Sequence, residues 1–329
     1  KLGVSALCGS LAAVSAANAG DLTVSGGADL SWQSMDDTTT GNPIGIGSNY
    51  GLSGSGELDN GWTVSLGINM TNKNIYSNTD VTITVPALGD FIISNGVSGS
   101  GIDRMDDVTP NVWEEAYASG LSTGINTVAG GSGGTGIEWT PNMLPDGLTA
   151  RIHWTPDSGG SNINDKATGG AGDGDTGWDV TLVATDAITG MTGLTIGGGI
   201  SEVEETWTNS DGDREEMTVY ATYAVGGFTL GYQWSEEDLG MSSNEQQYDN
   251  EGYGITFAVN DDLSIGYNHY ESKQTSTTNV TAEADSMQIS YSYGGASIRI
   301  MDASADNMDY STAVTQDRDN TVISLGLAF

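Results

Sequence analysis

One segment of this chain concentrates charged side chains that could attract ions. Between Gly96 and Gly134 the sequence places several acids and one base around Pro110 and Trp113. These charged residues are Asp103, Arg104, Asp106, Asp107, Glu114 and Glu115. Closely spaced carboxylates produce a negative potential that concentrates cations. A solvated surface loop is the alternative, although so long a segment without regular structure is usually functional in a compact fold.

Catalysis finds little support in the residue types present. The chain has two histidines, and the alternation of their predicted strands turns His153 to one face and His269 to the other. The HExxH pattern of zinc hydrolases is absent from the sequence. We therefore expect neither an enzyme nor a required cofactor.

Acidic pairs in other polar segments could bind calcium, which takes oxygen ligands from flexible loops. The candidates are Asp173, Asp175, Asp211 and Asp213. A complete calcium-binding loop of the EF-hand type does not surround them, so the signal is weak. A solvated acidic rim is the simpler interpretation.

The overall charge narrows the classes of partner. There are 44 acidic residues against 9 lysines and arginines, which gives a formal net charge of −35. Nucleic acid is therefore not an expected partner, because its phosphates would be repelled. Intrinsic disorder is disfavoured because the chain contains 8 tryptophans and 13 tyrosines.

The first residues have the features of an export signal. Lys1 precedes an apolar stretch, and Ala17-Asn18-Ala19 has the small-residue pattern of a cleavage site. We expect residues 1–19 to be a signal peptide and residues 20–329 to form one domain; a short buried helix is the alternative. Cys8, the only cysteine, lies in the signal segment, so the mature chain would have no disulfide.

The rest of the chain is dominated by alternating apolar and polar residues, which predicts half-buried antiparallel strands. The predicted strands are Leu22–Gln33, Ile46–Leu58, Trp62–Thr71, Asp80–Val85, Gly89–Asn95, Thr135–Thr140, Gly147–Thr155, Gly177–Asp186, Gly193–Glu204, Glu215–Val225, Phe228–Glu236, Asn250–Val259, Leu263–Ser272, Ala284–Tyr293, Ala296–Ser304 and Asn320–Phe329. After residue 19 no apolar run approaches the roughly 18 residues of a membrane-spanning helix. A count of two strands fewer or more stays open.

The connections and the last strand favour a closed barrel in lipid over a soluble sandwich. Short Gly- and Asn-rich turns alternate along the chain with long acidic loops, as in outer-membrane barrels. The final strand has one apolar face and ends on Phe329. In water its free edge would be prone to aggregation, whereas barrel closure removes the edge and lipid covers the apolar face.

If the apolar face of each strand meets lipid, the alternate residues point into the barrel. Leu148, Ala150 and Ile152 then point outward. The charged or titratable residues expected on the inner wall are Arg151, His153, Arg299, Glu57, Glu138 and Asp179. Arg151 and Arg299 are the only arginines expected on strands. The lumen should therefore be net negative and favour cations.

Sixteen short strands, a terminal Phe, a signal segment and one outsized third loop resemble the general diffusion porins of Gram-negative outer membranes. The alphaproteobacterial branch is the most similar, judging from Gly20-Asp-Leu-Thr-Val-Ser-Gly-Gly27 and the acidic loops. The resemblance covers the whole mature chain. It implies a sixteen-stranded antiparallel transmembrane β-barrel with short periplasmic turns, long extracellular loops and an inserted third loop.

The resemblance also implies a function and partners. It implies a homotrimer of water-filled pores through which small hydrophilic solutes and ions diffuse passively, surrounded by outer-membrane lipid. The third loop would narrow each pore, with Arg151 and Arg299 on the wall opposite its acids. In this family a terminal aromatic strand is a tag for the barrel-assembly machinery, which gives Phe329 a role in insertion. A structural or adhesive barrel with little conductance is the alternative.

Overall fold

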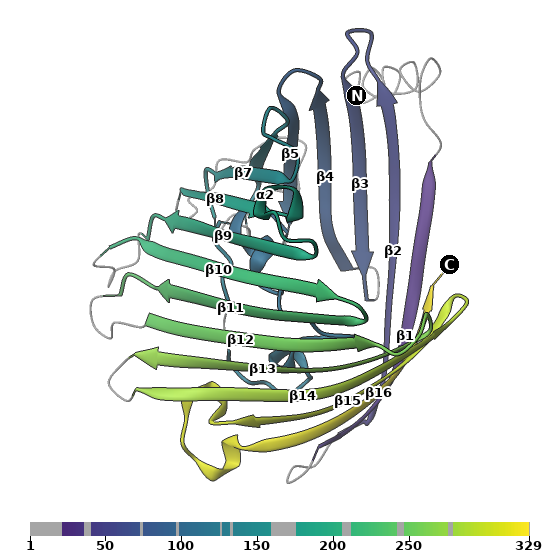
Figure 1. Cartoon of the computed structure of the whole chain (residues 1–329), viewed down its shortest axis with the longest axis vertical. Coiled ribbons are helices and arrows are strands. Elements are labelled where there is room, and N and C mark those ends of the chain that lie inside the picture. The colour runs from purple at the N-terminus through teal and green to yellow at the C-terminus, as the bar shows by residue number, and fades with distance from the viewer. Residues whose placement is uncertain are drawn as a thin grey trace, which may run out of the picture.

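The chain forms a closed antiparallel barrel of sixteen strands, in which each strand pairs with its sequence neighbours and β1 pairs with β16 (Figure 1). The computed structural model describes residues 22–35, 41–72, 75–96, 99–125, 127–131, 134–158, 176–205, 212–241, 247–275 and 279–328. The strands are β1 (Thr23–Met35), β2 (Ile44–Glu57), β3 (Thr63–Thr71), β4 (Ile75–Val85), β5 (Gly89–Gly96), β6 (Gly136–Pro141), β7 (Leu148–Thr155), β8 (Gly177–Ala184), β9 (Leu194–Val203), β10 (Arg214–Val225), β11 (Phe228–Asp238), β12 (Gln247–Ala258), β13 (Leu263–Thr275), β14 (Val280–Tyr293), β15 (Ala296–Asp306) and β16 (Arg318–Ala328). The predicted fold class is confirmed.

In the described ranges, helix is confined to short turns. They are η1 (Gly101–Met105), η2 (Ala116–Ala118), α2 (Asp186–Thr189), η3 (Met308–Tyr310) and η4 (Val314–Gln316). Among the described residues no helix is long and apolar enough to cross a membrane.

The terminal strand closes the barrel as its two-faced pattern predicts. In the β1–β16 ladder, Leu30 lies opposite Leu325 and Trp32 opposite Ile323, so the apolar faces of the two strands are continuous. Phe329 and the predicted signal peptide lie outside the described residues.

Two segments predicted as loops are largely strand. Residues 75–79 extend β4, while residues 273–275 and 280–283 extend β13 and β14. At the ends of β13 and β14 the outward positions Lys273, Thr281 and Glu283 are polar, whereas Ala282 is buried on the inner face. The pattern of apolar outward and polar inward residues that marks a strand is therefore lost there. Once a strand rises beyond the apolar band, neither face needs greasy residues, and the backbone ladder alone maintains the pairing.

Tight turns join strands at one rim. The hairpins β10–β11 and β14–β15 turn on two glycines each, and Gly226 and Gly294 both have φ of +60°. A positive φ at the first turn position is what a two-residue hairpin of type II′ needs, and glycine adopts it without a steric penalty.

The packed core lies inside the barrel. An apolar cluster joins the segment between β5 and β6 to the inner faces of β13, β14 and β15. Its members are Ala116, Leu121, Ile125, Tyr270, Ala282, Ala284, Met301, Ala303, Ala305 and Met308. Alanines on the strands leave room for this segment to lie against the wall. Full burial of a side chain such as Met308 contributes about 1.5–3 kcal/mol.

Candidate functional site

The connection between β5 and β6, residues 97–135 and here called loop 3, folds into the barrel. Its helix η1 packs against β7, β8 and β9, and η2 packs against β13, β14 and β15. In Figure 1 its described part, in blue, lies within the ring of strands. The predicted insertion of loop 3 is confirmed, so the interior is narrowed at this level.

Side chains from the wall hold the backbone of loop 3. The Gln288 amide accepts the backbone N–H of Trp113 at 2.9 Å and donates to the carbonyl of Glu114. Asn320 Nδ2 donates to the carbonyl of Ser119 at 2.7 Å. Each bond satisfies a backbone group that would otherwise be buried without water.

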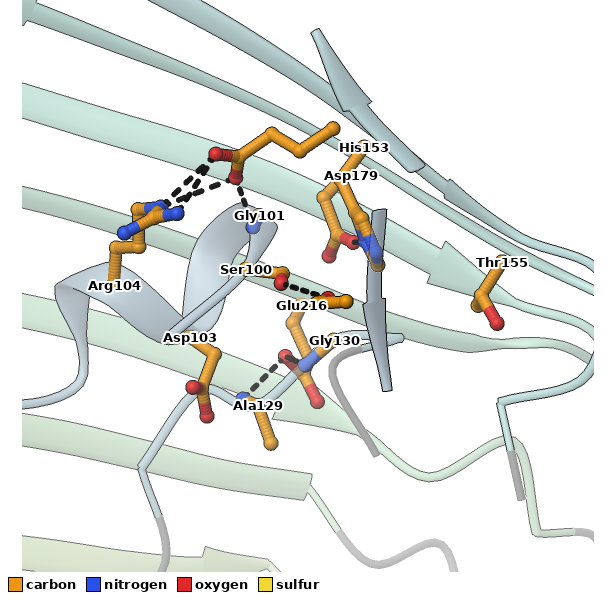
Figure 2. Close-up of polar contacts among 12 residues, drawn as sticks. Ser100, Gly101, Asp103, Arg104, Ala129, Gly130, His153, Thr155, Asp179 and Glu216 are labelled. Carbon is orange, nitrogen blue, oxygen red and sulfur yellow. Dashed lines mark hydrogen bonds and ion pairs between the residues drawn. The ribbon is translucent and has the colours of Figure 1, made fainter. Parts of the chain in front are cut away.

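Two buried carboxylates hold the two limbs of the loop (Figure 2). Glu138, 1% exposed, accepts the backbone N–H of Gly101 at 2.7 Å and pairs with Arg104 Nη2 at 2.8 Å. On the returning limb, Glu216 accepts the N–H groups of Ala129 at 2.9 Å and Gly130 at 2.6 Å. A charged acceptor makes stronger bonds to N–H groups than a neutral one does.

A buried His–Asp pair lies where the two limbs meet. His153 Nδ1 and Asp179 Oδ2 are 2.7 Å apart, and both side chains are almost fully buried. Gly101 and Gly130 press on Asp179 from the two limbs, and a Cβ on Gly101 would come 2.5 Å from its Oδ2. Only glycine lets both limbs approach this closely, so the predicted wall residues His153 and Asp179 support loop 3.

The predicted loop residues divide into two groups. Arg104 is bound to Glu138, and Asp103 accepts the N–H of Gly99. Asp106 is partly covered and Glu115 is buried, whereas Asp107 and Glu114 are exposed to the lumen. Loop 3 therefore presents unburied carboxylates to the open part of the barrel.

Two acids of loop 3 have strongly raised pKa values. Burial, together with the neighbouring carboxylates Asp107 and Asp103, raises the pKa of Asp106 to about 8. Burial, opposed by hydrogen bonding and reinforced by Asp107, raises the pKa of Glu115 to about 7. Burial also raises the pKa of Glu114, and Arg299 opposes that shift.

The predicted wall arginines do not form one basic patch. Arg151 lies on β7 with its Nε 3.9 Å from Glu138 Oε1. Arg299 lies on β15, where it pairs with Asp29 and stands over the Trp113 ring at 4.9 Å. Each arginine is thus next to an acid, and the two contact different parts of the site, Arg151 near Glu138 and Arg299 at Trp113.

Sequence analysis missed several charged residues of the lumen. Arg214 begins β10, 3.7 Å from Glu216, and Arg318 begins β16, which corrects the expectation that only Arg151 and Arg299 lie on strands. The outward positions of Met217 and Val219 already implied that Glu216 and Arg214 point inward. Asp29 was missed because its ion pair joins the first strand to the fifteenth, a contact that only closure creates.

The remaining predicted residues lie away from the loop. Glu57 ends β2 beside a short turn, opposite Thr63. His269 continues the outward face of β13 and stacks on Tyr253, so the two histidines lie on opposite sides of the wall. Within the described ranges, no group of three or more His, Cys, Asp or Glu is placed to hold a metal ion. Asp213 is among the described residues, whereas Asp173, Asp175 and Asp211 lie outside them.

A closed barrel whose interior is narrowed by an inserted loop is typical of membrane-spanning β-barrel channels. A model of the Gram-negative porin family matches residues 3–313, and the chain belongs to this family. The family and the fold make it an outer-membrane diffusion channel.

Solved structures agree with this assignment at the level of the fold. OmpF of Salmonella typhi, solved with daunomycin, is 14% identical with a TM-score of 0.69, over 94% of this chain and 98% of that one. The anion-selective porin of Comamonas acidovorans is 12% identical with a TM-score of 0.69, over 94% and 99%. OmpT of Vibrio cholerae in its trimer form is 11% identical with a TM-score of 0.66, over 94% and 99%. No curated protein sequence matches the chain.

Proposed function

We propose that this diffusion channel prefers cations and passes small hydrophilic solutes passively. The main support is the distribution of charge in the lumen. Arg104 and Arg151 share Glu138, Arg214 lies beside Glu216 and Arg299 pairs with Asp29, so carboxylates offset most of this positive charge. Arg318, at the loop-side end of β16, donates to the carbonyl of Thr315. Asp107 and Glu114 are both exposed, and neither forms a salt bridge within the described residues, while Arg299 acts on Glu114 at longer range.

A negatively charged, water-filled lumen with walls of low dielectric constant raises the local concentration of cations and lowers that of anions. The test is the reversal potential of the purified protein in a planar bilayer across a salt gradient. A potential of the sign given by cation permeation supports the proposal, and the opposite sign refutes it.

Neutralising the exposed loop acids should reduce cation preference. In the double variant Asp107→Asn/Glu114→Gln the reversal potential should move toward zero, because two uncompensated charges leave the narrowed level. The variant Arg299→Gln should move it the other way by freeing the charge of Asp29. The matched control Glu57→Gln removes an acid near the short-turn rim and should change the potential little. An unchanged potential in the double variant would place the selective charges elsewhere.

An adhesive or structural role is less well supported. Loop 3 lies inside the barrel, where it cannot be displayed to a partner outside. We assign no catalytic role, since His153 is locked in a buried pair under the loop.

We also propose that the protein forms a homotrimer. Residues 1–19 would act as a signal peptide that directs export and is then cleaved. The trimer form of OmpT from Vibrio cholerae, which shares the fold, supports the oligomeric state. Calcium at the acidic loop positions near Asp213 stays a prediction that a calcium titration of channel stability would test.

Phe329 is proposed to serve insertion by the barrel-assembly machinery. Deleting it should lower the amount of assembled protein in the outer membrane, because the last strand would lose its terminal aromatic residue. The conductance of each channel that does assemble should be unchanged, since loop 3 sets the narrow level. Heat-modifiable mobility on gels and single-channel recording measure the two quantities. An altered unit conductance would contradict this role.

A further inference from the structure

The inner wall of the first strands differs from the wall that carries loop 3. A hollow of about 460 Å³ lies on β1 to β4. Its inward-facing lining consists of hydroxyl and amide side chains: Ser25, Asn49, Asn69, Thr71 and Asn78. Small-molecule sites commonly occupy about 300–1,000 Å³, so the hollow has room for one solute.

The depth of the hollow comes from β2. Of its inward positions that line the hollow, Gly51 carries no side chain and Asn49 stands beside it; Gly45 and Gly47, beyond the lining, are also without side chains. A Cβ on Gly51 would come 2.8 Å from Asn69 Oδ1 and 3.4 Å from Ser25 Oγ. The neighbouring polar side chains therefore lean over a bare backbone, and side chains at the glycines would push them away.

The polar groups of the hollow form a short hydrogen-bonded series. Asn69 Nδ2 donates to Asn78 Oδ1 at 2.8 Å, and Asn78 Nδ2 donates to Asp80 Oδ1 at 3.4 Å. Asn49 and Ser25 are exposed to the lumen. Each amide offers both a donor and an acceptor, which is the combination that a sugar hydroxyl also presents.

The hollow contains no fixed positive charge. Along the described parts of β1 to β4, the inward ionisable groups are Asp29, Glu57 and Asp80. Asp29 is paired with Arg299, and Glu57 lies near the short-turn rim. An anion would gain nothing here, whereas a neutral solute can exchange its water hydrogen bonds for those of the amides.

We propose that this hollow is a weak binding subsite for neutral polyhydroxylated solutes of the sugar class. Solutes passing the narrowed level would pause there, with hydroxyl groups bonded to Asn49, Asn69 and Asn78. The inference rests on the proposed channel function and adds a solute class to it.

The experiment uses the wild-type channel in a planar bilayer with raffinose added, and polyethylene glycol of equal hydrodynamic size as the comparison. Raffinose should lower the conductance along a saturating curve and add current noise from binding and release. Polyethylene glycol has no hydroxyl groups along its length, so its effect should rise in proportion to concentration without saturation.

A double variant tests the residues. Asn49→Leu/Asn69→Leu keeps side-chain size but removes the amides, and should raise the half-saturating raffinose concentration about tenfold, because several weak hydrogen bonds are lost. Thr82→Val, on the same wall but closer to the short-turn rim, is the matched control and should leave it unchanged.

The outcomes separate this inference from the channel function. If wild-type protein conducts but raffinose behaves like polyethylene glycol, only the subsite is overturned. A half-saturating concentration unchanged in the double variant likewise overturns it. If the protein does not conduct at all, both the channel and the subsite fail.

Discussion

Replacing Glu138 by alanine is expected to free the ingoing limb of loop 3 and make the channel noisy. The carboxylate is buried and binds both Gly101 and Arg104, with Arg151 nearby. Its loss leaves a buried N–H unsatisfied and an arginine charge uncompensated. Removing one partner of a fully buried ion pair costs about 3–5 kcal/mol, and the cost here is lower because the Arg104 side chain is 32% exposed and water screens its charge. The strand ladder is untouched, so the barrel itself should still assemble.

Single-channel recording measures this effect. The Glu138→Ala channel should show larger current fluctuations and a changed mean conductance, because the loop samples several positions. Glu138→Gln keeps an acceptor for the Gly101 N–H and should give an intermediate result. Glu57→Ala removes an acid from the same face near the short-turn rim and should behave like wild type. A quiet Glu138→Ala channel would show that the remaining wall contacts hold the loop alone.

Raising the pH from about 6 to about 9 is expected to increase cation preference. The pKa values of about 8 for Asp106 and about 7 for Glu115 mean that both acids are largely protonated at the lower pH. As the pH rises through these values each side chain gains a negative charge. The acids that act on them are Asp103, Asp107 and Glu114, and Tyr117 stays neutral because burial raises its pKa.

The same shifts predict a weaker hold on loop 3 at alkaline pH. Because the packed loop raises both pKa values, it favours the protonated acids. That stabilisation is fully present below the ordinary carboxyl pKa and is lost as the pH rises through 7 to 8. Reversal potentials and current noise recorded across this range measure both effects. Asp106→Asn/Glu115→Gln should flatten the dependence, and a variant that keeps the full pH response would assign it to other groups.

The alternation in the sequence located every strand, but some of the predicted strand ends were wrong, and the reason is physical. Alternation is visible only where one face meets lipid. It therefore identified β11 from Phe228, Leu230 and Tyr232, but not the beginnings of β4 or β14, which lie beyond the regular outward apolar pattern. The inward direction of Arg151, His153 and Glu138 followed from the same parity, since a strand has only two faces.

The roles of these residues could not be obtained in the same way. Asp29 meets Arg299 because β1 closes against β16, and Gly101 meets Gly130 at Asp179 because loop 3 turns back on itself. Both contacts join residues far apart in the chain, and neither leaves a local pattern. The apolar packing of Met308 and Leu121 in one cluster, inside a barrel whose interior was expected to be polar, likewise joins residues far apart in the chain and leaves no local sequence pattern.

The sequence by itself therefore determined the barrel, its sixteen strands, the face of each side chain and the excess of acid, because all of these follow from period, turn residues and composition. Only the tertiary structure decided which acids are compensated. Glu138 and Glu216 accept hydrogen bonds from the backbone of loop 3, whereas the side chains of Asp107 and Glu114 are exposed to the lumen. Charge acts through distance and burial, and both are set by how loop 3 lies within the closed wall.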